Sequence, residues 1–108
     1  VVDRTFRSPV VHQAYLEPHA AVADYDALAG TLHVYTSTQG QFGVRDELSR
    51  LLRMPRARVT VTPMAVGGGF GAKYGILEPL AAAASVAVHR PVRVTLTRSE
   101  DFLTTTPT

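Results

Sequence analysis

Four short stretches of the chain are rich in β-forming residues, and most of them alternate between apolar and polar positions. They cover residues 20–25, 31–36, 58–62 and 92–97. In the second stretch, Leu32 and Val34 fall on one face, as expected for a half-buried strand. Residues 26–30 end on a glycine and predict a hairpin connection. Residues 1–11 are also extended in character, and Pro9 suggests the edge of a sheet.

Two longer stretches show the period of an α-helix. Residues 40–53 carry one apolar stripe, and Pro55 ends this helix. The stripe comprises Val44, Leu48, Leu51 and Leu52. Residues 74–88 predict a second helix with Pro79 in or near its first turn, because an interior proline costs about 3 kcal/mol. The face expected to pack on the sheet comprises Leu80, Ala83, Ala84, Ala87 and Val88. Residues 98–101 predict the polar start of a loop.

The predicted elements follow the order strands, helix, strand, helix, strand, which indicates an α/β or α+β fold. We expect a mixed β-sheet with two helices packed on one face. A length of 108 residues fits a single domain, residues 1–108. Hydrophobic residues make up 45% of the chain and charged residues 19%, which is typical of a folded globular protein. The chain lacks an initiator Met, so we expect it to be part of a larger subunit.

Composition excludes several kinds of site. The chain has no cysteine, so it can form no disulfide, thiolate zinc site or protein-ligated iron–sulfur cluster of its own. The formal net charge is only +2, and the few aromatic residues are not interleaved with the basic ones, so we expect no nucleic-acid partner. No apolar run approaches the length of a membrane span. Lack of cysteine is compatible with the cytoplasm, which is the compartment that we expect.

Residues 66–73, VGGGFGAK, differ from the rest of the chain. Consecutive glycines cost backbone entropy and are used where φ must be positive or another atom must approach the backbone. The run follows a predicted strand and precedes a predicted helix, and such a corner can direct several N–H groups at one anion or ligand oxygen. Lys73 adds a cation at the edge. We therefore expect this stretch to face a ligand.

Two common nucleotide-binding motifs are also rich in glycine. A phosphate-binding P-loop requires glycine directly before Lys-Ser/Thr, whereas Ala72 precedes Lys73 and Tyr74 follows it, so the chain does not contain that motif. Gly67, Gly69 and Ala72 satisfy the dinucleotide-binding pattern G-x-G-x-x-G/A, but the acidic residue expected about 20 positions on comes too late. A tight turn that serves packing alone would also use glycine here.

Several side chains outside the run are also candidates. Gln39 stands at a predicted strand-to-helix corner, where its amide can donate to one oxygen and accept from a neighbour, or simply close a turn. Glu17 and His19, together with His12, suggest a metal pair or acid–base chemistry. Their spacing matches no helical metal pattern, so a glutamate that ties down backbone N–H groups is the better interpretation. Tyr74 either lines a pocket or covers the sheet edge. Glu78 suits the first turn of its helix because of the helix dipole.

A set of motifs occurs in order along nearly the whole chain. They are LEPH at residues 16–19, YTSTQ at 35–39, VGGGFGAK at 66–73, PVRV at 91–94 and TRSED at 97–101. Together they resemble the molybdopterin-binding large subunit of the xanthine dehydrogenase/aldehyde oxidase family, which includes aerobic carbon monoxide dehydrogenases. The glycine motif is specific in combination with the upstream Ser-Thr-Gln and the downstream Arg-x-Glu-Asp.

The resemblance implies roles for the matching positions. Gln39 matches the glutamine whose amide hydrogen-bonds an oxygen ligand of molybdenum. Phe70 matches the residue whose backbone N–H reaches the metal's oxygen ligand, and Gly68, Gly69 and Gly71 belong to the same cofactor-binding loop.

The position after the motif lysine departs from one branch of the family. Xanthine-type members carry a glutamate there that holds the purine, whereas this chain has Tyr74. The resemblance therefore places Tyr74 in the substrate pocket and argues against a purine. An aldehyde, a heteroaromatic compound or carbon monoxide stays open as the small-molecule substrate.

The resemblance also implies a reaction and partners. The family hydroxylates a substrate carbon with oxygen from water, and electrons leave through 2Fe-2S clusters to FAD on partner subunits or domains. Molybdenum is held by the dithiolene sulfurs of molybdopterin, in the simple or the cytosine dinucleotide form, so we expect no side-chain ligand to the metal. The catalytic glutamate and most pterin-binding loops belong to the rest of the large subunit, so we expect no catalytic residue in this fragment and no activity of it alone.

The alternatives are a Rossmann-type dinucleotide-binding domain and a cofactor-free structural domain.

Overall fold

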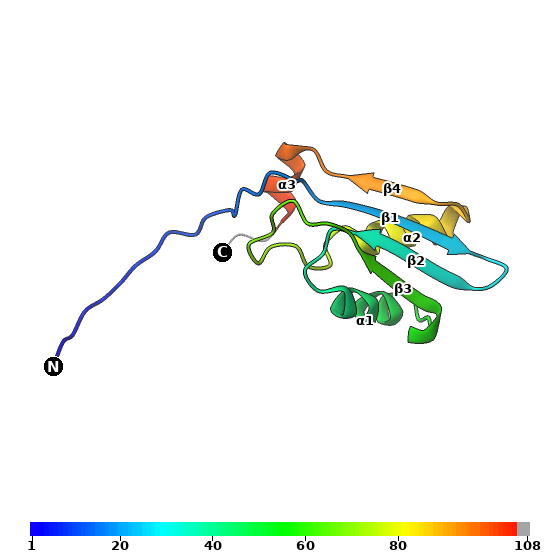
Figure 1. The fold of residues 1–108 in the computed structure, drawn as a ribbon, viewed down its shortest axis with the longest axis horizontal. Coiled ribbons are helices and arrows are strands. Elements are labelled where there is room, and N and C mark those ends of the chain that lie inside the picture. The colour runs from blue at the N-terminus through cyan, green and yellow to red at the C-terminus, as the bar shows by residue number, and fades with distance from the viewer. Residues whose placement is uncertain (106–108) are drawn as a thin grey trace.

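The computed structural model describes residues 1–105 and contains one mixed sheet of four strands (Figure 1). Strand β1 (Ala20–Asp26) pairs antiparallel with β2 (Thr31–Thr36) on one side and with β4 (Val92–Thr95) on the other. Strand β3 (Val59–Pro63) lies parallel to β2, which gives the order β3-β2-β1-β4. The mixed sheet predicted from the sequence is confirmed.

Two helices pack on one face of this sheet, as predicted. Helix α1 (Gln41–Leu51) packs on β3, and α2 (Glu78–Val88) packs on β1 and β4 and also contacts α1. The core between the helices and the sheet comprises Ala21, Ala23, Leu32, Val34, Val44, Leu48, Val59, Leu77, Ala81 and Ala82. The strand residues among them come from alternate positions, which is why one face of the sheet is buried within this chain.

The apolar stripe predicted for the first helix is confirmed except at Leu51. Val44 and Leu48 are buried and Leu52 packs partly buried against the core, whereas Leu51 is 48% exposed at the end of α1. The chain turns away at Arg53, whose φ of 52° lies outside the helical range, before it reaches Pro55. A single 3₁₀ turn, η1 (Arg56–Arg58), then leads into β3.

The second helix differs from the prediction in its start and in its buried face. It begins at Glu78, because Gly75 has a φ of 51° and interrupts the helix before that point, although Pro79 does occupy the first turn. Its buried residues are Glu78, Ala81, Ala82 and Ser85. Leu80, which was expected to pack on the sheet, is 60% exposed, and the other members of the predicted face also lie outside the core.

The buried face of α2 carries two polar side chains because each has a partner in the sheet or at the helix end. Thr36 Oγ1 donates to Glu78 Oε1 at 2.8 Å. Ser85 Oγ accepts from the Tyr25 N–H at 2.9 Å and donates to the Arg90 carbonyl oxygen at 2.8 Å. Alanines occur all around this helix, so its faces differ little in hydrophobicity. Because Glu78 and Ser85 lie on the buried face, the sequence pattern favoured the other face as the apolar one.

The segment predicted as a polar loop is a third helix, α3 (Arg98–Thr104). Thr97 Oγ1 accepts from the Glu100 N–H at 3.3 Å, and Glu100 Oε2 accepts from the Thr97 N–H at 2.8 Å. This reciprocal pair is a capping box, which replaces the missing partners at a helix start. The N–H and the hydroxyl of Thr97 lower the pKa of the Glu100 carboxyl. None of the helices within residues 1–105 has the length and apolar character needed to cross a bilayer.

Residues 1–11 form no strand, contrary to the prediction. They are exposed, and Figure 1 shows them leading away from the sheet. Extended character alone does not make a strand, because no neighbouring strand supplies the ladder of hydrogen bonds.

We predict that substitutions on the two faces of α2 differ sharply in their effect on the free energy of unfolding. Ala81→Leu should destabilise the chain by about 1–3 kcal/mol, because a larger side chain overpacks the close contact with β1. Ala83→Leu, on the exposed face, should change stability by no more than about 0.5 kcal/mol. The measurement is the free energy of unfolding from urea denaturation. Equal costs for the two variants would show that the buried face is assigned wrongly.

We also predict that acid loosens the start of α3. Because the pKa of Glu100 lies below its ordinary value of 4.5, the capping box contributes stability above that pH and loses it as pH falls through the lower pKa of the folded state. The protection factor of the Thr97 amide hydrogen, measured by NMR hydrogen exchange, should therefore fall as the pH drops below 4.5. Glu100→Gln should remove this dependence, and a pH-independent protection factor in the unsubstituted chain would contradict it.

Candidate functional site

Three segments that are distant in the sequence meet at one end of the sheet. Residues 37–39 follow β2 and residues 64–73 follow β3, and because these strands are parallel both segments leave the sheet at the same end. Residues 15–19 lead into β1, which is antiparallel to β2, so they enter the sheet at that end too. Figure 1 shows these loops beside one another. The topology therefore assembles the site.

The glycine loop, residues 67–71, forms a tight and unusual turn. The Ala72 N–H donates to the Gly69 carbonyl oxygen at 2.8 Å and closes the turn. Gly68 has a φ of 93° and Phe70 a φ of 48°. Positive φ is easy for glycine but is an outlier for a bulky residue such as Phe70. Phe70 is 72% exposed, so burial of its ring does not hold this conformation.

Most N–H groups of the glycine loop have no hydrogen-bond acceptor among the described residues. Within residues 1–105, the N–H groups of residues 68–71 donate to no protein acceptor. Successive unpaired N–H groups in a turn of this kind form a concave site for an anion or a ligand oxygen. These residues therefore fit a cofactor that is rich in oxygen atoms.

Gln39 lies directly against the glycine loop. The side-chain Oε1 of Gln39 accepts from the main-chain N–H of Lys73 at 3.2 Å. The main-chain N–H of Gln39 donates to the Lys73 carbonyl oxygen at 2.9 Å. A Cβ atom on Gly69 would lie 2.5 Å from Gln39 Oε1, so this approach requires glycine. Because Oε1 is already an acceptor, the amide nitrogen of Gln39 is the part available to donate to a ligand. The structure thus brings together the glutamine and the glycine loop that the sequence singled out separately.

Glu17 connects the two ends of the glycine loop. Its Oε2 accepts from the Gly67 N–H at 2.7 Å and from Lys73 Nζ at 2.5 Å. Burial acts to raise the pKa of Glu17, but the hydrogen bonds from Lys73 and the Gly67 N–H, together with the positive charge of Lys73, outweigh it and lower the pKa below its ordinary value. The prediction that Glu17 ties down backbone N–H groups is confirmed for Gly67. The lysine, expected at the edge of the loop, is buried, and its ammonium group is paired with Glu17.

Tyr74 borders a different hollow. Its ring lies against Gly40 at the start of α1, where a Cβ atom would come within 2.9 Å of Tyr74 Cδ1. The residue is 54% exposed and lines a cavity of about 270 Å³. The other lining residues are Gly40, Gly43, Val44, Glu47 and Gly75. Tyr74 therefore lines a hollow, and its contact with a substrate stays a prediction.

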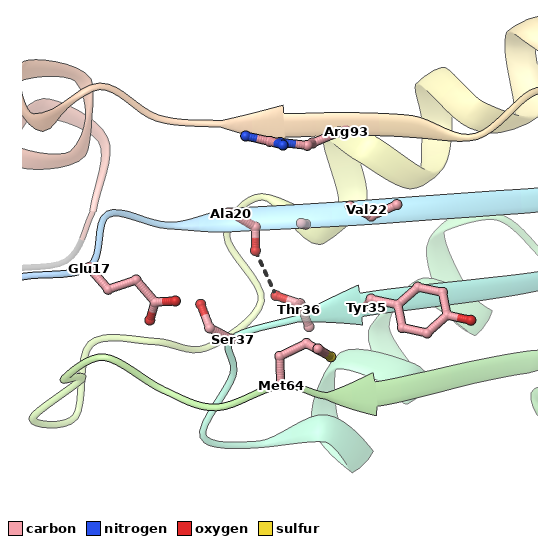
Figure 2. A pocket seen from close by; sticks show the side chains of 9 residues that line it. Glu17, Ala20, Val22, Tyr35, Thr36, Ser37, Met64 and Arg93 are labelled. Atoms are coloured by element: carbon pink, nitrogen blue, oxygen red, sulfur yellow. Dashed lines mark hydrogen bonds between the residues drawn. The ribbon is translucent and has the colours of Figure 1, made fainter.

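A second hollow, of about 280 Å³, lies on the sheet face that carries no helix (Figure 2). Figure 2 shows Glu17 and Ser37 at one end of it and Arg93 beside the strands. Ala20, Ala21, Val22, Tyr35, Thr36 and Met64 complete its lining. No sequence motif indicated this hollow, because its lining comes from short pieces of three strands and from the segments that flank them.

A buried polar cluster was also missed by the sequence analysis. His19 Nδ1 lies 2.8 Å from Asp101 Oδ1, and the Tyr15 hydroxyl donates to the same oxygen at 3.1 Å. All three residues are almost fully buried, and burial raises the pKa of Tyr15. The cluster fastens the segment before β1 to α3. Histidine and aspartate each stand in a recognised motif, but nothing in the sequence pairs them. Within residues 1–105, no group of three or more His, Cys, Asp or Glu side chains could hold a metal ion.

The dinucleotide-binding alternative is wrong. In that fold the glycine pattern turns directly into a helix after a strand of a mostly parallel sheet. Here α2 begins only at Glu78, and β1 is antiparallel to both of its neighbours. Glu100, an acidic residue that follows the glycine pattern too late in the sequence for the ribose contact, caps α3 instead.

Comparison with known proteins agrees with the geometry. The whole chain, residues 1–108, matches the family described as "Molybdopterin cofactor-binding domain". Nicotinate hydroxylase hnxS from Emericella nidulans is 37% identical over 93 residues, which are 83% of this chain and 7% of that protein. The carbon monoxide dehydrogenase large chain from Hydrogenophaga pseudoflava is 36% identical over 99 residues, 90% of this chain and 12% of that protein.

A solved structure gives the same result. Quinoline 2-oxidoreductase from Pseudomonas putida 86 superposes with a TM-score of 0.80 and 32% identity over 86% of this chain and 12% of that one. The chain therefore spans only between 7% and 12% of the length of these relatives. With its full length matched and its glycine loop set against Gln39, the chain belongs to the molybdopterin cofactor-binding domain family, whose relatives include xanthine dehydrogenases, aldehyde oxidoreductases and carbon monoxide dehydrogenases.

Proposed function

We propose that this chain is one domain of the large subunit of a molybdenum hydroxylase and supplies part of its molybdopterin pocket. The observation that carries the proposal is the row of unpaired N–H groups at residues 68–71 beside the Gln39 amide. Gln39, Gly68, Gly69, Phe70 and Gly71 are the residues that would contact the cofactor. Family membership supports the identity of the ligand, and the loop supports the manner of binding.

These donors are useful because they are fixed before the ligand arrives. Backbone N–H groups held in a turn need no reorganisation to meet a developing negative charge on an oxygen. One such donor is typically worth about 3 kcal/mol of transition-state stabilisation. When bound, molybdopterin supplies the metal that exchanges electrons and oxygen with the substrate. The chain's own contribution is to bind and orient the cofactor's oxygen atoms.

The activity proposed for the complete protein is hydroxylation of an aldehyde or heteroaromatic carbon. Water supplies the oxygen, and the electron pair released by the carbon passes to 2Fe-2S clusters and FAD on partner subunits or domains. Relatives named as a nicotinate hydroxylase and a quinoline 2-oxidoreductase support a heteroaromatic substrate. The base and the remaining cofactor contacts are assigned to the rest of the large subunit, so the domain alone should be inactive.

Tyr74 is the proposed substrate-facing residue of this chain. It follows the glycine loop closely and borders the hollow at the start of α1. A tyrosine there offers an aromatic face and one hydroxyl, and the only carboxylate that lines the hollow within the described residues is that of Glu47 in α1. The aromatic face favours a flat substrate.

We predict that Gln39→Ala in the full-length, assembled enzyme lowers turnover roughly 100-fold, as expected for the loss of one preorganised donor, while the molybdenum content changes little. Steady-state kinetics and metal analysis of the purified protein are the measurements. Gln41→Ala, a glutamine two positions on in α1, is the matched control and should leave turnover unchanged. Unchanged turnover in Gln39→Ala with a full complement of cofactor would favour the cofactor-free scaffold role.

We further predict that Gly69→Ala acts through Gln39. The added Cβ would lie 2.5 Å from Gln39 Oε1, so the amide must move away and turnover should fall about as much as in Gln39→Ala. Because both substitutions remove the same contact, the Gly69→Ala/Gln39→Ala double variant should be little worse than either single one. Additive losses in this double-mutant cycle, measured by turnover, would show that the two residues act independently.

A further inference from the structure

One carboxylate oxygen holds both ends of the glycine loop. Glu17 Oε2 accepts from the Gly67 N–H at the start of the loop and from Lys73 Nζ just beyond its end. The Glu17 N–H also donates to the Gly67 carbonyl oxygen at 3.2 Å. Glu17 therefore contacts the loop through both its main chain and its side chain.

The lysine cannot leave this arrangement easily. Its side chain is 0% exposed, and Nζ lies 4.9 Å from the centre of the Tyr15 ring. A buried ammonium group without a carboxylate partner is strongly unfavourable. The main chain of Lys73 is held as well, because its N–H and carbonyl oxygen bond to Gln39. Position 73 is thus fixed from two sides.

The first glycine of the run, Gly67, allows the close approach of Glu17. A Cβ atom on Gly67 would lie 2.6 Å from Glu17 Cβ, which is closer than carbon atoms approach one another in proteins. No side chain fits there while the two main chains remain paired. Gly67 also has its N–H committed to Glu17, unlike residues 68–71. The loop therefore divides into an anchored start and a free, ligand-facing part.

The segment that carries Glu17 is itself rigidly supported. Tyr15 and His19 stand on either side of Glu17, and both bond to the buried Asp101 of α3. The Leu96 N–H donates to the His19 carbonyl oxygen at 3.0 Å, which ties the segment to the end of β4. Glu17 is thus held in place independently of the loop that it contacts.

We propose that Glu17 is a positioning residue, which sets the direction of the free N–H groups at residues 68–71 by fixing both ends of the glycine loop. This inference rests on the proposed function, because it assigns those N–H groups to molybdopterin. Four successive residues that include three glycines have large conformational freedom, and each unfixed backbone loses entropy when a ligand orders it. Anchoring by Glu17 removes that loss before the cofactor binds.

Glu17 also borders the hollow of Figure 2, where a carboxylate could serve as an acid–base group. Its Oε2 is already committed to Gly67 and Lys73. The lowered pKa keeps the carboxylate charged at neutral pH, so it carries no proton to donate. Both observations favour positioning over proton transfer.

The test uses the full-length large subunit assembled with its partners. Glu17→Ala alone leaves a buried, unpaired lysine and threatens folding, so the main variant is the double substitution Glu17→Ala/Lys73→Met, which keeps an apolar stem over Tyr15. Glu17→Gln, which removes only the charge, is the second variant. Asp24→Asn, at an exposed carboxylate in β1, is the control. The readouts are the rate of molybdenum and pterin loss on dialysis, and hydrogen exchange in cofactor-free protein.

The double variant should lose molybdenum roughly 10- to 100-fold faster than the unsubstituted protein, the usual effect of removing a group that orients a metal site's ligands. Amide exchange should rise in a peptide covering residues 66–74 and stay unchanged in β1, β2 and α2. Exchange that rises throughout the domain would reduce Glu17 to a general stabilising residue and overturn the proposal. So would unchanged exchange and unchanged molybdenum retention in both variants. Absence of molybdenum and pterin from the unsubstituted protein would instead overturn the proposed function, so the two failures are distinguishable.

Discussion

A bare stretch of main chain can present its N–H groups to a ligand only if other groups hold it in place, and here the ion pair between the buried Lys73 and the half-buried Glu17 does so. Glu17 and Lys73 join two segments that the sequence places far apart. Removal of Glu17 should cost more than removal of one partner of a surface salt bridge, because it would leave the Lys73 ammonium group buried and unpaired. The same carboxylate takes the Gly67 N–H, so one group satisfies both a charge and a backbone donor.

The sheet places the partners of this ion pair close together. Parallel pairing of β2 and β3 sends Gln39 and the glycine loop out at the same end. Antiparallel pairing of β1 with β2 brings Glu17 to that end from the opposite direction. The helices contribute to the site only indirectly: α1 and α2 bury one face of the sheet, and α3 fixes the segment before β1 through Asp101. The arrangement explains why the site is built entirely from loops while its supports are regular elements.

Local patterns in the sequence predicted much of this frame. Alternation located the strands, and the stripe at Val44 and Leu48 located α1, because both signals reflect burial of one face. The buried face of α2 could not be predicted, because alanines occur on all sides of the helix. Ser85 on that face bonds to backbone groups that come close only in the folded chain. Helix α3 was not predicted, although Thr97 and Glu100 have the spacing of a capping box. In this case the sequence does contain a local signal for the helix start. The partnership of Glu17 with Lys73 depends on topology, and no local pattern contains it.

The conformation of Phe70 shows why these supports are needed. A bulky residue at a φ of 48° is strained, and its exposed ring gains little from packing that would offset the strain. The turn closed between Gly69 and Ala72 must therefore be imposed from outside, by Gln39 on one side and by Glu17 through Lys73 on the other. Strain that persists at an exposed position, beside N–H groups that have no protein acceptor within residues 1–105, is not explained by folding alone. It is the feature expected where a loop is shaped for a ligand before that ligand binds.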